Sequence, residues 1–426
     1  MRAFLAAAAT LAVTLGVTSP GAGAQPGPRA RAARSQLSTV KRALAQGVKL
    51  AGRSSGAYVD DLTTGQVLFA SAASTPRLPA SVQKLYTTST ALLRFGPQAN
   101  LVTSVYGVGQ LDANRAWNGK LYLRGGGDPT FGSASYDQFA YGTGATLQRL
   151  VTNLLRASPI RSVHGAIIGD ESYFDSRRGT PATGYAAGSY VEGQLSALIY
   201  DRGFADQQGT TFQRRPALFS TDAFAGALRA ARVKIPASTR IYTGSTPPGA
   251  KLLTVVHSPR LATLIKLTNT PSDNYFAEML LKGLGARFAH SGTTAAGVAV
   301  VKAQIAKSFG IHPSFDDGSG LSYGDHSSPL EIGRLLAKMA SNPDFMNSLA
   351  VAGETGTLSG EMNGTVAQGK CRGKTGTLSA VSNLVGYCTA RNGHTLAFAF
   401  LMNAVDPNAA HPIQNAMAEA LAAYDG

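Results

Sequence analysis

Three short segments constrain this chain more than any other feature of its sequence. Ser81-Val82-Gln83-Lys84, Ser272-Asp273-Asn274 and Lys374-Thr375-Gly376 follow one another in that order along 426 residues. Together they supply a hydroxyl nucleophile, a nearby amine, a hydroxyl-amide pair and a cationic strand, which are the groups needed for acyl transfer through a serine ester. Each segment alone is short enough to occur by chance. Only their joint occurrence, in this order and in compatible local contexts, predicts the chemistry.

Ser81 and Lys84 are the predicted nucleophile and proton acceptor. Residues three apart on a helix share a face, and the apolar pattern up to Phe95 predicts a helix that begins near Ser81. A lysine accepts a proton only where burial or a neighbouring cation lowers its pKa, and Lys374 is the candidate for that cation. The alternative is an ordinary serine N-cap with a solvated lysine one turn later. Ser38–Lys41 has the same spacing, but its position close to the N-terminus, with no strand pair before it, disfavours it.

Ser272 and Asn274 lie at a break between two helical patterns, where side chains can face a cleft. A hydroxyl can relay a proton, and an amide can orient a lysine or a substrate carbonyl group. The alternative is a Ser-Asp-Asn turn or helix cap with no chemical role. We therefore predict Ser272 and Asn274 as catalytic residues only together with the other two segments.

The segment Lys374 to Thr377 is predicted to be a strand that binds substrate. The hydroxyl groups of Thr375 and Thr377, together with Lys374, are suited to a substrate carboxylate, and Gly376 permits close approach of another group to the backbone. The amide of Thr377, paired with that of Ser81, is suited to an oxyanion. The alternative is a basic edge strand that only discourages aggregation.

The N-terminus predicts export. Residues 1–24 have a positive start, an apolar run and a small-residue ending, which is typical of a secretory signal cleaved after Ala24. Residues 25–40 contain Pro, Ala and Arg and are expected to form a flexible basic lead-in. No run reaches the ~18 apolar residues that a spanning helix needs. We therefore expect no transmembrane anchor and a location in the periplasm or on the extracellular, cell-wall side.

The charge balance predicts surroundings rather than chemistry. The chain carries 39 Lys and Arg against 24 Asp and Glu, a net charge of +15, which favours polyanions such as anionic wall polymers. The alternative is a solvated basic surface with no specific partner. No nucleic-acid-binding motif accompanies the charge, so no nucleic-acid partner is expected.

The cysteines leave two structures open. Cys371 and Cys388 flank a predicted hairpin, so they form either a cross-strand disulfide in an oxidising compartment or two buried free thiols. Two cysteines and seven scattered histidines give no helix-spaced ligand pair, and no metal site is predicted.

The order of predicted elements indicates an α+β core interrupted by an insertion. Residues 41–97 and 253–426 are expected to form one domain that carries the three segments, and residues 98–252 an inserted α/β domain. Helices after the insertion are expected near residues 293–308, 329–341 and 410–424.

With these residues the chain resembles the D-alanyl-D-alanine carboxypeptidase/endopeptidase family of class C low-molecular-mass penicillin-binding proteins. Four further parts of the sequence carry the resemblance: Gly125-Gly126-Gly127-Asp128-Pro129, Gly165-Ala166-Ile167-Ile168-Gly169-Asp170, Asp317-Gly318-Ser319-Gly320-Leu321-Ser322 and Gly356-Thr357-Leu358. The resemblance extends over the chain from about residue 40. It implies the penicillin-recognising α+β transpeptidase fold, an antiparallel sheet flanked by helices, with an insertion between the first and second motifs.

The resemblance also implies roles. Ser81 would be the acyl-ester nucleophile and Lys84 its proton acceptor. Ser272 and Asn274 would assist proton transfer to the leaving amine, and Lys374 would help bind the terminal carboxylate. The substrate would be a peptidoglycan stem peptide ending in D-Ala-D-Ala, or a D-Ala-linked cross-bridge. β-Lactams would be covalent inhibitors, water would release the acyl-enzyme, and no cofactor would be needed.

One length departs from the family. The gap from Lys84 to Ser272 is 272 − 84 = 188 residues, shorter than expected for members with two inserted subdomains, so we expect one subdomain to be reduced or missing after Tyr200. Two other functions share some of the motifs. A serine β-lactamase is disfavoured by the long insertion, and a non-catalytic wall-binding protein is disfavoured by the intact motifs.

Overall fold

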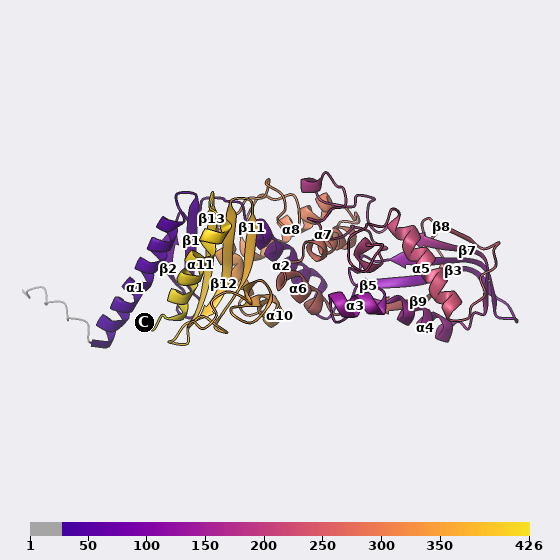
Figure 1. Cartoon of the computed structure of the whole chain (residues 1–426), viewed down its shortest axis with the longest axis horizontal. Coiled ribbons are helices and arrows are strands. Elements are labelled where there is room, and N and C mark those ends of the chain that lie inside the picture. The colour runs from indigo at the N-terminus through magenta and orange to yellow at the C-terminus, as the bar shows by residue number, and fades with distance from the viewer. Residues whose placement is uncertain (1–27) are drawn as a thin grey trace, which may run out of the picture.

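The computed structural model describes residues 28–426. Along its longest axis the chain has three parts in succession: a sheet with helix α1 (Pro28–Leu50) beside it, a group of helices, and a second sheet with its own helices (Figure 1). The second sheet forms the end that lies farthest from α1. The predicted signal segment, residues 1–24, lies outside the described residues.

The first sheet has six strands in the order β10-β11-β12-β13-β1-β2. Every neighbouring pair in it is antiparallel. The strands are β1 (Ser55–Asp61), β2 (Gln66–Ser71), β10 (Ala350–Val351), β11 (Cys371–Leu378), β12 (Val381–Thr389) and β13 (Thr395–Asn403). An antiparallel sheet flanked by helices confirms the predicted α+β class.

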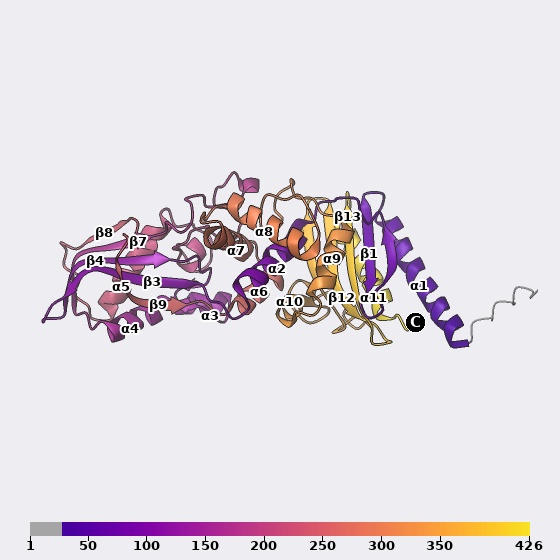
Figure 2. The ribbon, with the colours of Figure 1, turned by 180° about the vertical axis from the view of Figure 1, so that it is seen from behind.

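Helices cover both faces of this sheet. Helices α1 and α11 (Pro407–Ala422) pack on one face, and α9 (Pro329–Met339) packs on the other, across β13 and β1 (Figure 2). Because side chains alternate along a strand, each strand supplies both cores. On β13, Phe398 and Phe400 join the core under α11, whereas Ala399 and Leu401 join the core under α9.

The group of helices in the middle continues the core under α9. Tyr275, Leu280 and Val301 are fully buried there, in the same core as the side chains of the six-stranded sheet that face α9. The helices of this group are α2 (Lys84–Phe95), α6 (Leu261–Asn269), α7 (Asn274–Phe288), α8 (Thr294–Phe309) and α10 (Pro343–Ser348). Helices α2 and α7 begin at Lys84 and Asn274, so two of the predicted site residues stand at helix starts.

The second sheet has five strands in the order β8-β7-β4-β3-β9 and is mixed. The β3–β4 and β3–β9 pairs are antiparallel, and the β4–β7 and β7–β8 pairs are parallel. Helices α4 (Leu147–Ala157) and α5 (Pro216–Ala230) share one core with it. The remaining elements are β3 (Val102–Leu111), β4 (Ala116–Gly125), β5 (Phe131–Gly132), α3 (Ala134–Ala140), β6 (Ala145–Thr146), β7 (Ser162–Asp170), β8 (Arg240–Thr243) and β9 (Lys251–His257). We call this part of the chain the insert.

Two boundary predictions need correction. The segment 25–40, expected as a flexible lead-in, is helical from Pro28 onward as part of α1. Ala and Arg are strong helix formers, Pro is favoured in a first helical turn, and Val40 and Leu44 are buried in the core that α1 shares with α11. At the other boundary, β9 pairs with β3 as far as His257, so the sheet of the insert continues past the expected end at residue 252.

The two cysteines are joined. Cys371 on β11 lies opposite Cys388 on β12 in the antiparallel register, and a disulfide links them. The sequence left open a disulfide or two buried free thiols, and the two cysteines form the disulfide. Among residues 28–426, no helix is long and apolar enough to cross a membrane.

Candidate active site

Ser81 lies in a short 3-10 turn, η1 (Ala80–Gln83), that leads directly into α2. The turn is held by two close backbone approaches. A Cβ on Gly376 would lie 2.5 Å from the Pro79 carbonyl oxygen, and a Cβ on Gly320 would lie 1.9 Å from the Ala80 carbonyl oxygen. The predicted close approach at Gly376 is thus observed, and the approaching group is the turn that carries Ser81. Ala80 itself has a left-handed φ of 47°, a strained conformation of the kind that clusters at functional sites.

Lys84 is fully buried and makes three hydrogen bonds. Its Nζ donates to Ser81 Oγ at 2.8 Å, to Asn274 Oδ1 at 2.6 Å and to the Ser319 carbonyl oxygen at 2.8 Å. Burial is the main cause that lowers the pKa of Lys84, to about 8. Of the two causes that the sequence left open, burial or a neighbouring cation, loss of solvation lowers the pKa of Lys84, while nearby carboxylates oppose the shift.

The second segment joins α6 to α7. Ser272 has a left-handed φ of 70°, and the carboxylate of Asp273 caps α7 by accepting the Phe276 amide at 2.9 Å. The cap explains why a helix begins at Asn274. The side-chain oxygen of Asn274 accepts a hydrogen bond from Lys84. The second segment therefore both caps α7 and contacts the lysine.

Lys374 on β11 is also fully buried. Its Nζ donates to Ser272 Oγ at 2.7 Å and to the Thr375 carbonyl oxygen at 2.8 Å. Burial first, and the charge of Lys84 second, hold the pKa of Lys374 well below its usual value. Lys84 and Lys374 are thus each bonded to a serine hydroxyl, and the three segments meet.

A cavity of about 710 Å³ opens onto these residues. Ser81, Asn274 and Thr377 line it, together with Gly320 and the exposed rings of Tyr190 and Tyr323. Strand β10 covers only Arg372 and Gly373 of β11, so the part of β11 with Thr377 is a sheet edge facing the cavity. Thr375 is not among the residues that line this cavity: its hydroxyl donates to Thr357 Oγ1 at 2.9 Å.

The structure therefore brings together all eight predicted site residues around two buried lysines: Ser81, Lys84, Ser272, Asn274, Lys374, Thr375, Gly376 and Thr377. The rival pair does not join them. Ser38 and Lys41 lie exposed on α1, where Ser38 Oγ donates to the Ser35 carbonyl oxygen at 2.7 Å. The same spacing on a surface helix thus has no buried lysine.

Sequence reasoning assigned no role to two further parts of the site. The first is the loop around Ser319, whose carbonyl oxygen accepts from Lys84 and whose amides are held by the carboxylate of Asp317. The segment from Asp317 to Ser322 also carries the resemblance to the family, so the sequence does give a signal there. The second is a loop of the insert, where Glu192 and Arg202 contact the second segment, and no motif marked it.

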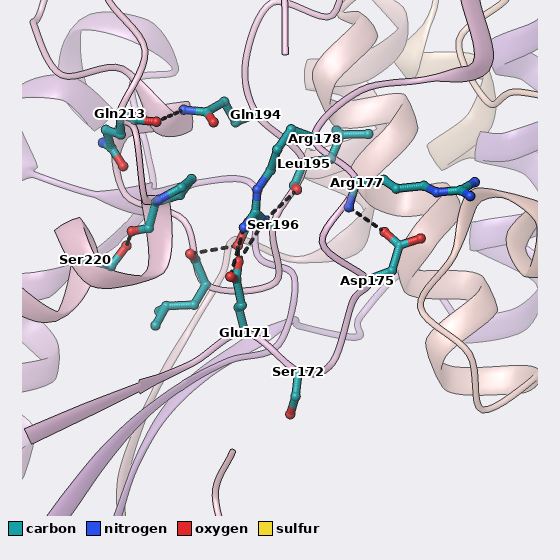
Figure 3. Close-up of polar contacts among 12 residues, drawn as sticks. Glu171, Ser172, Asp175, Arg177, Arg178, Gln194, Leu195, Ser196, Gln213 and Ser220 are labelled. Carbon is teal, nitrogen blue, oxygen red and sulfur yellow. Dashed lines mark hydrogen bonds and ion pairs between the residues drawn. The ribbon is translucent and has the colours of Figure 1, made fainter. Parts of the chain in front are cut away.

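This loop of the insert is anchored by a compact polar network (Figure 3). Arg178 donates two hydrogen bonds to the carboxylate of Glu171, at 2.7 and 2.8 Å, and a third to the Leu195 carbonyl oxygen at 3.2 Å. Ser196 Oγ donates to Glu171 at 2.5 Å, and Gln194 donates to the Gln213 carbonyl oxygen at 2.9 Å. The loop is therefore held in one conformation by charged and backbone partners.

Comparison with known proteins agrees with the predicted family and fold. The D-Ala-D-Ala carboxypeptidase 3 (S13) family matches residues 36–214 and 202–424. A D-alanyl-D-alanine carboxypeptidase of Actinomadura sp. is 29% identical over 88% of this chain and 82% of its own length. A carboxypeptidase of Mycobacterium tuberculosis is 30% identical over 84% of this chain and 77% of its own length.

Solved structures share the fold. Penicillin-binding protein 4 of Haemophilus influenzae superposes with a TM-score of 0.69 at 22% identity, covering 87% of this chain and 98% of that one. A predatory peptidoglycan endopeptidase of Bdellovibrio bacteriovorus gives a TM-score of 0.52 at 18% identity, covering 82% and 86%. The fold is thus that of the penicillin-binding serine enzymes. The chain belongs to the D-Ala-D-Ala carboxypeptidase family, whose members are serine-type DD-carboxypeptidases.

Proposed function

We propose that the protein is an exported DD-peptidase that cleaves D-alanyl-D-alanine in peptidoglycan through an acyl-enzyme on Ser81. The single observation that carries the proposal is the contact between Lys84 Nζ and Ser81 Oγ at 2.8 Å, made by a lysine whose burial lowers its pKa to about 8. Near neutral pH a useful fraction of such a lysine is neutral and can accept the proton of the serine. Family membership supports the same reaction class.

The acylation step uses the residues around the cavity. Ser81 Oγ attacks the carbonyl carbon of the penultimate D-Ala while Lys84 takes the hydroxyl proton, and the amides of Ser81 and Thr377 stabilise the oxyanion. The C–N bond then breaks, and the proton reaches the leaving D-alanine amine from Lys84, assisted by Ser272 and Asn274. Lys374 and Thr377 of β11 bind the terminal carboxylate of the substrate, whereas Thr375, whose hydroxyl donates to Thr357, does not line the cavity.

The deacylation step returns the enzyme to its starting state. Water attacks the ester carbon, its proton passes to Lys84, and the C–O bond to Ser81 breaks as Ser81 Oγ recovers a proton. The products are free D-alanine and a stem peptide shortened by one residue, or two separated peptides where the bond is a D-Ala-linked cross-bridge. β-Lactams would acylate Ser81 in the same way and leave more slowly. No cofactor takes part.

The setting of this reaction is also part of the proposal. The signal-like residues 1–24 would direct export, and the net charge of +15 would hold the protein near anionic wall polymers. Residues 28–97 and 258–426 would form the catalytic domain and residues 98–257 the inserted domain, with the bounds moved to include α1 and β9. The shortening of the insert expected after Tyr200 stays a prediction. The two segments of this chain that match the family overlap at residues 202–214, close to that point.

Release of D-alanine from a peptide ending in D-Ala-D-Ala tests the function. We expect the wild type and Ser38→Ala to release D-alanine at the same rate, because Ser38 lies exposed on α1. Ser81→Ala should release none. Ser38→Ala is the matched control, since it removes the serine of the other Ser-x-x-Lys pair. Release by Ser81→Ala at the wild-type rate would contradict the proposal.

A further inference from the structure

A loop of the insert, residues 185–204, reaches across to the second segment of the site. The Tyr190 carbonyl oxygen accepts from Asn274 Nδ2 at 2.7 Å, and Glu192 Oε2 accepts from the Asn274 amide at 2.8 Å. Arg202 donates two hydrogen bonds to Asp273, at 2.8 and 3.0 Å. Every one of these contacts joins the insert to the residues that precede and begin α7.

The loop is shaped to make these contacts. A Cβ on Gly193 would lie 2.6 Å from the ring of Tyr275, so glycine is what lets the loop lie against α7. Glu192, Asp201 and Arg202 all have left-handed φ values, of 63°, 50° and 56°, which side chains adopt only where the surroundings enforce them. The Arg202 guanidinium also stacks 4.7 Å from the centre of the Tyr275 ring.

Apolar residues anchor the 185–204 loop in the core of the helices. Val191, Leu195 and Ile199 are buried in the core that surrounds α7, and the polar network of Figure 3 ties Gln194, Leu195 and Ser196 to the rest of the insert. With apolar anchors on one side and charged contacts on the other, the loop restricts the positions that Asn274 can take. This restriction matters because Asn274 Oδ1 is bonded to Lys84.

The charges around Lys84 come from several elements. Carboxylates that face it belong to Glu192 in the loop, Asp273 before α7, Glu278 on α7 and Asp317 in the loop before α9. The neighbouring cation is Lys374 on β11. Arg202 compensates Asp273 through the paired hydrogen bonds, and it lies 3.8 Å from Glu192.

We propose that Arg202 and Glu192 are positioning residues of the reaction: they fix the amide of Asn274 against Lys84 and set the charge that the lysine experiences. The proposal rests on the role given to Lys84 above. Glu192 adds negative charge near the lysine, whereas Arg202 removes it by pairing with Asp273. The two residues of one loop therefore act on the same lysine with opposite sign.

The test is the second-order rate of acylation by benzylpenicillin, measured in the intact protein between pH 5 and 10. The rate rises as Lys84 loses its proton, so the midpoint of the rise reports the pKa of the lysine. Glu192→Gln should move the midpoint down, and Arg202→Gln should move it up, each by roughly half a pH unit. Arg202→Gln should also lower the plateau rate by about 10- to 100-fold, because Asn274 loses its support.

Two further variants separate charge and fold from positioning. Arg202→Lys keeps the charge but loses the two-pronged geometry, so its midpoint should stay near the wild-type value while its plateau falls. Arg124→Gln removes an ion pair on the sheet of the insert, with Asp170 at 3.7 Å, that includes no residue of the second segment or of the 185–204 loop. It should leave both the midpoint and the plateau rate at the wild-type values.

The outcomes are distinguishable. Midpoints that move in the same direction in Glu192→Gln and Arg202→Gln, or that move in Arg124→Gln as well, would overturn the positioning roles while Ser81 is still acylated. If Ser81→Ala is acylated at the wild-type rate, the proposed function itself fails. Opposite shifts together with an unmoved Arg124→Gln midpoint support the inference.

Discussion

The two sheets of the molecule use their faces differently. Both faces of the six-stranded sheet are covered by helices, and both contribute large cores. The sheet of the insert has a large core only under α4 and α5, whereas on its other face the fully buried cluster is limited to Tyr122, Ala166 and Ile168. The two regions meet at the site, where the contrast between them has a chemical consequence.

The part of the chain with the six-stranded sheet contains the two lysines whose pKa is lowered, Lys84 and Lys374. Lys84 and Lys374 have no solvent exposure, and burial is the leading cause of the lowered pKa of each. The insert contributes a backbone carbonyl group and two charged side chains from a loop. Under the proposed mechanism, burial in the core lowers the pKa of the base, Lys84, and the charged side chains of the insert adjust that pKa. Four predictions test this division, from the largest effect to the smallest.

Removing the buried base should have the largest effect. Lys84→Met keeps an unbranched side chain in a site that is fully buried but deletes the proton acceptor. We expect penicillin acylation to fall by about 10³-fold with the fold retained, which circular dichroism would show. Lys41→Met on the exposed face of α1 is the matched control and should match the wild type. A fall of less than 10-fold in Lys84→Met would contradict the role of the lysine.

Adding a methyl group to a glycine should have different effects in the two regions. In Gly376→Ala the new Cβ would meet the Pro79 carbonyl oxygen at 2.5 Å, a backbone atom that cannot rotate away, so the turn carrying Ser81 must shift. We expect acylation to fall by about 10²-fold. In Gly226→Ala, on α5 of the insert, the Cβ meets nothing within 4 Å, and stability should rise by about 0.5–1 kcal/mol. Equal acylation by the two variants would remove the distinction between the regions.

The disulfide should stabilise only the six-stranded sheet. It closes a loop with a sequence separation of 17 between β11 and β12, and both cysteines of the chain lie there. Replacing both with alanine should lower the free energy of unfolding by about 3 kcal/mol. Dithiothreitol should bring the wild type to the same level in chemical denaturation and leave the variant unchanged. A wild type insensitive to dithiothreitol would instead indicate two free thiols.

The insert should show the smallest effect, through pH. Neither carboxylate oxygen of Asp137 has a hydrogen-bond partner among the described residues, and burial, with the charges of Asp128 and Asp201, raises its pKa to about 8. Because this folded-state value lies above the unfolded value of 3.8, the group's contribution to stability is lost as pH rises from about 4 to about 8. Asp137→Asn should therefore raise the melting temperature at pH 8 by roughly 2–4 °C and change it little at pH 4. A variant that melts below the wild type at pH 8 would contradict this sign.

The motifs predicted the contacts of the candidate site better than those of the insert. The order of Ser81, Ser272 and Lys374 was sufficient to predict one site, because each segment has side chains with few other uses in that combination. The start of α7 at Asn274 was readable as a helix cap. The close approach at Gly376 was readable as well, since glycine in a strand indicates a neighbouring backbone.

The other features of the site and the fold could not be predicted from the sequence, because they depend on contacts between segments far apart in the chain. Arg202 and Asp273 are 71 residues apart, and neither belongs to a pattern that links them. Helix α1 likewise packs with α11, at the other end of the chain, and Val40 and Leu44 are buried in the core that the two helices share. The burial that lowers the pKa of Lys84 comes from tertiary packing, so the sequence left burial and a neighbouring cation as alternative causes.

The most direct test of the central claim is the attachment site of a penicillin. The wild-type protein is incubated with benzylpenicillin, digested and mapped by tandem mass spectrometry, with Ser81→Ala and Ser38→Ala treated in parallel. The account predicts one adduct, on the peptide that contains Ser81, present in Ser38→Ala and absent from Ser81→Ala. An adduct on Ser38, or an adduct that persists in Ser81→Ala, would contradict it.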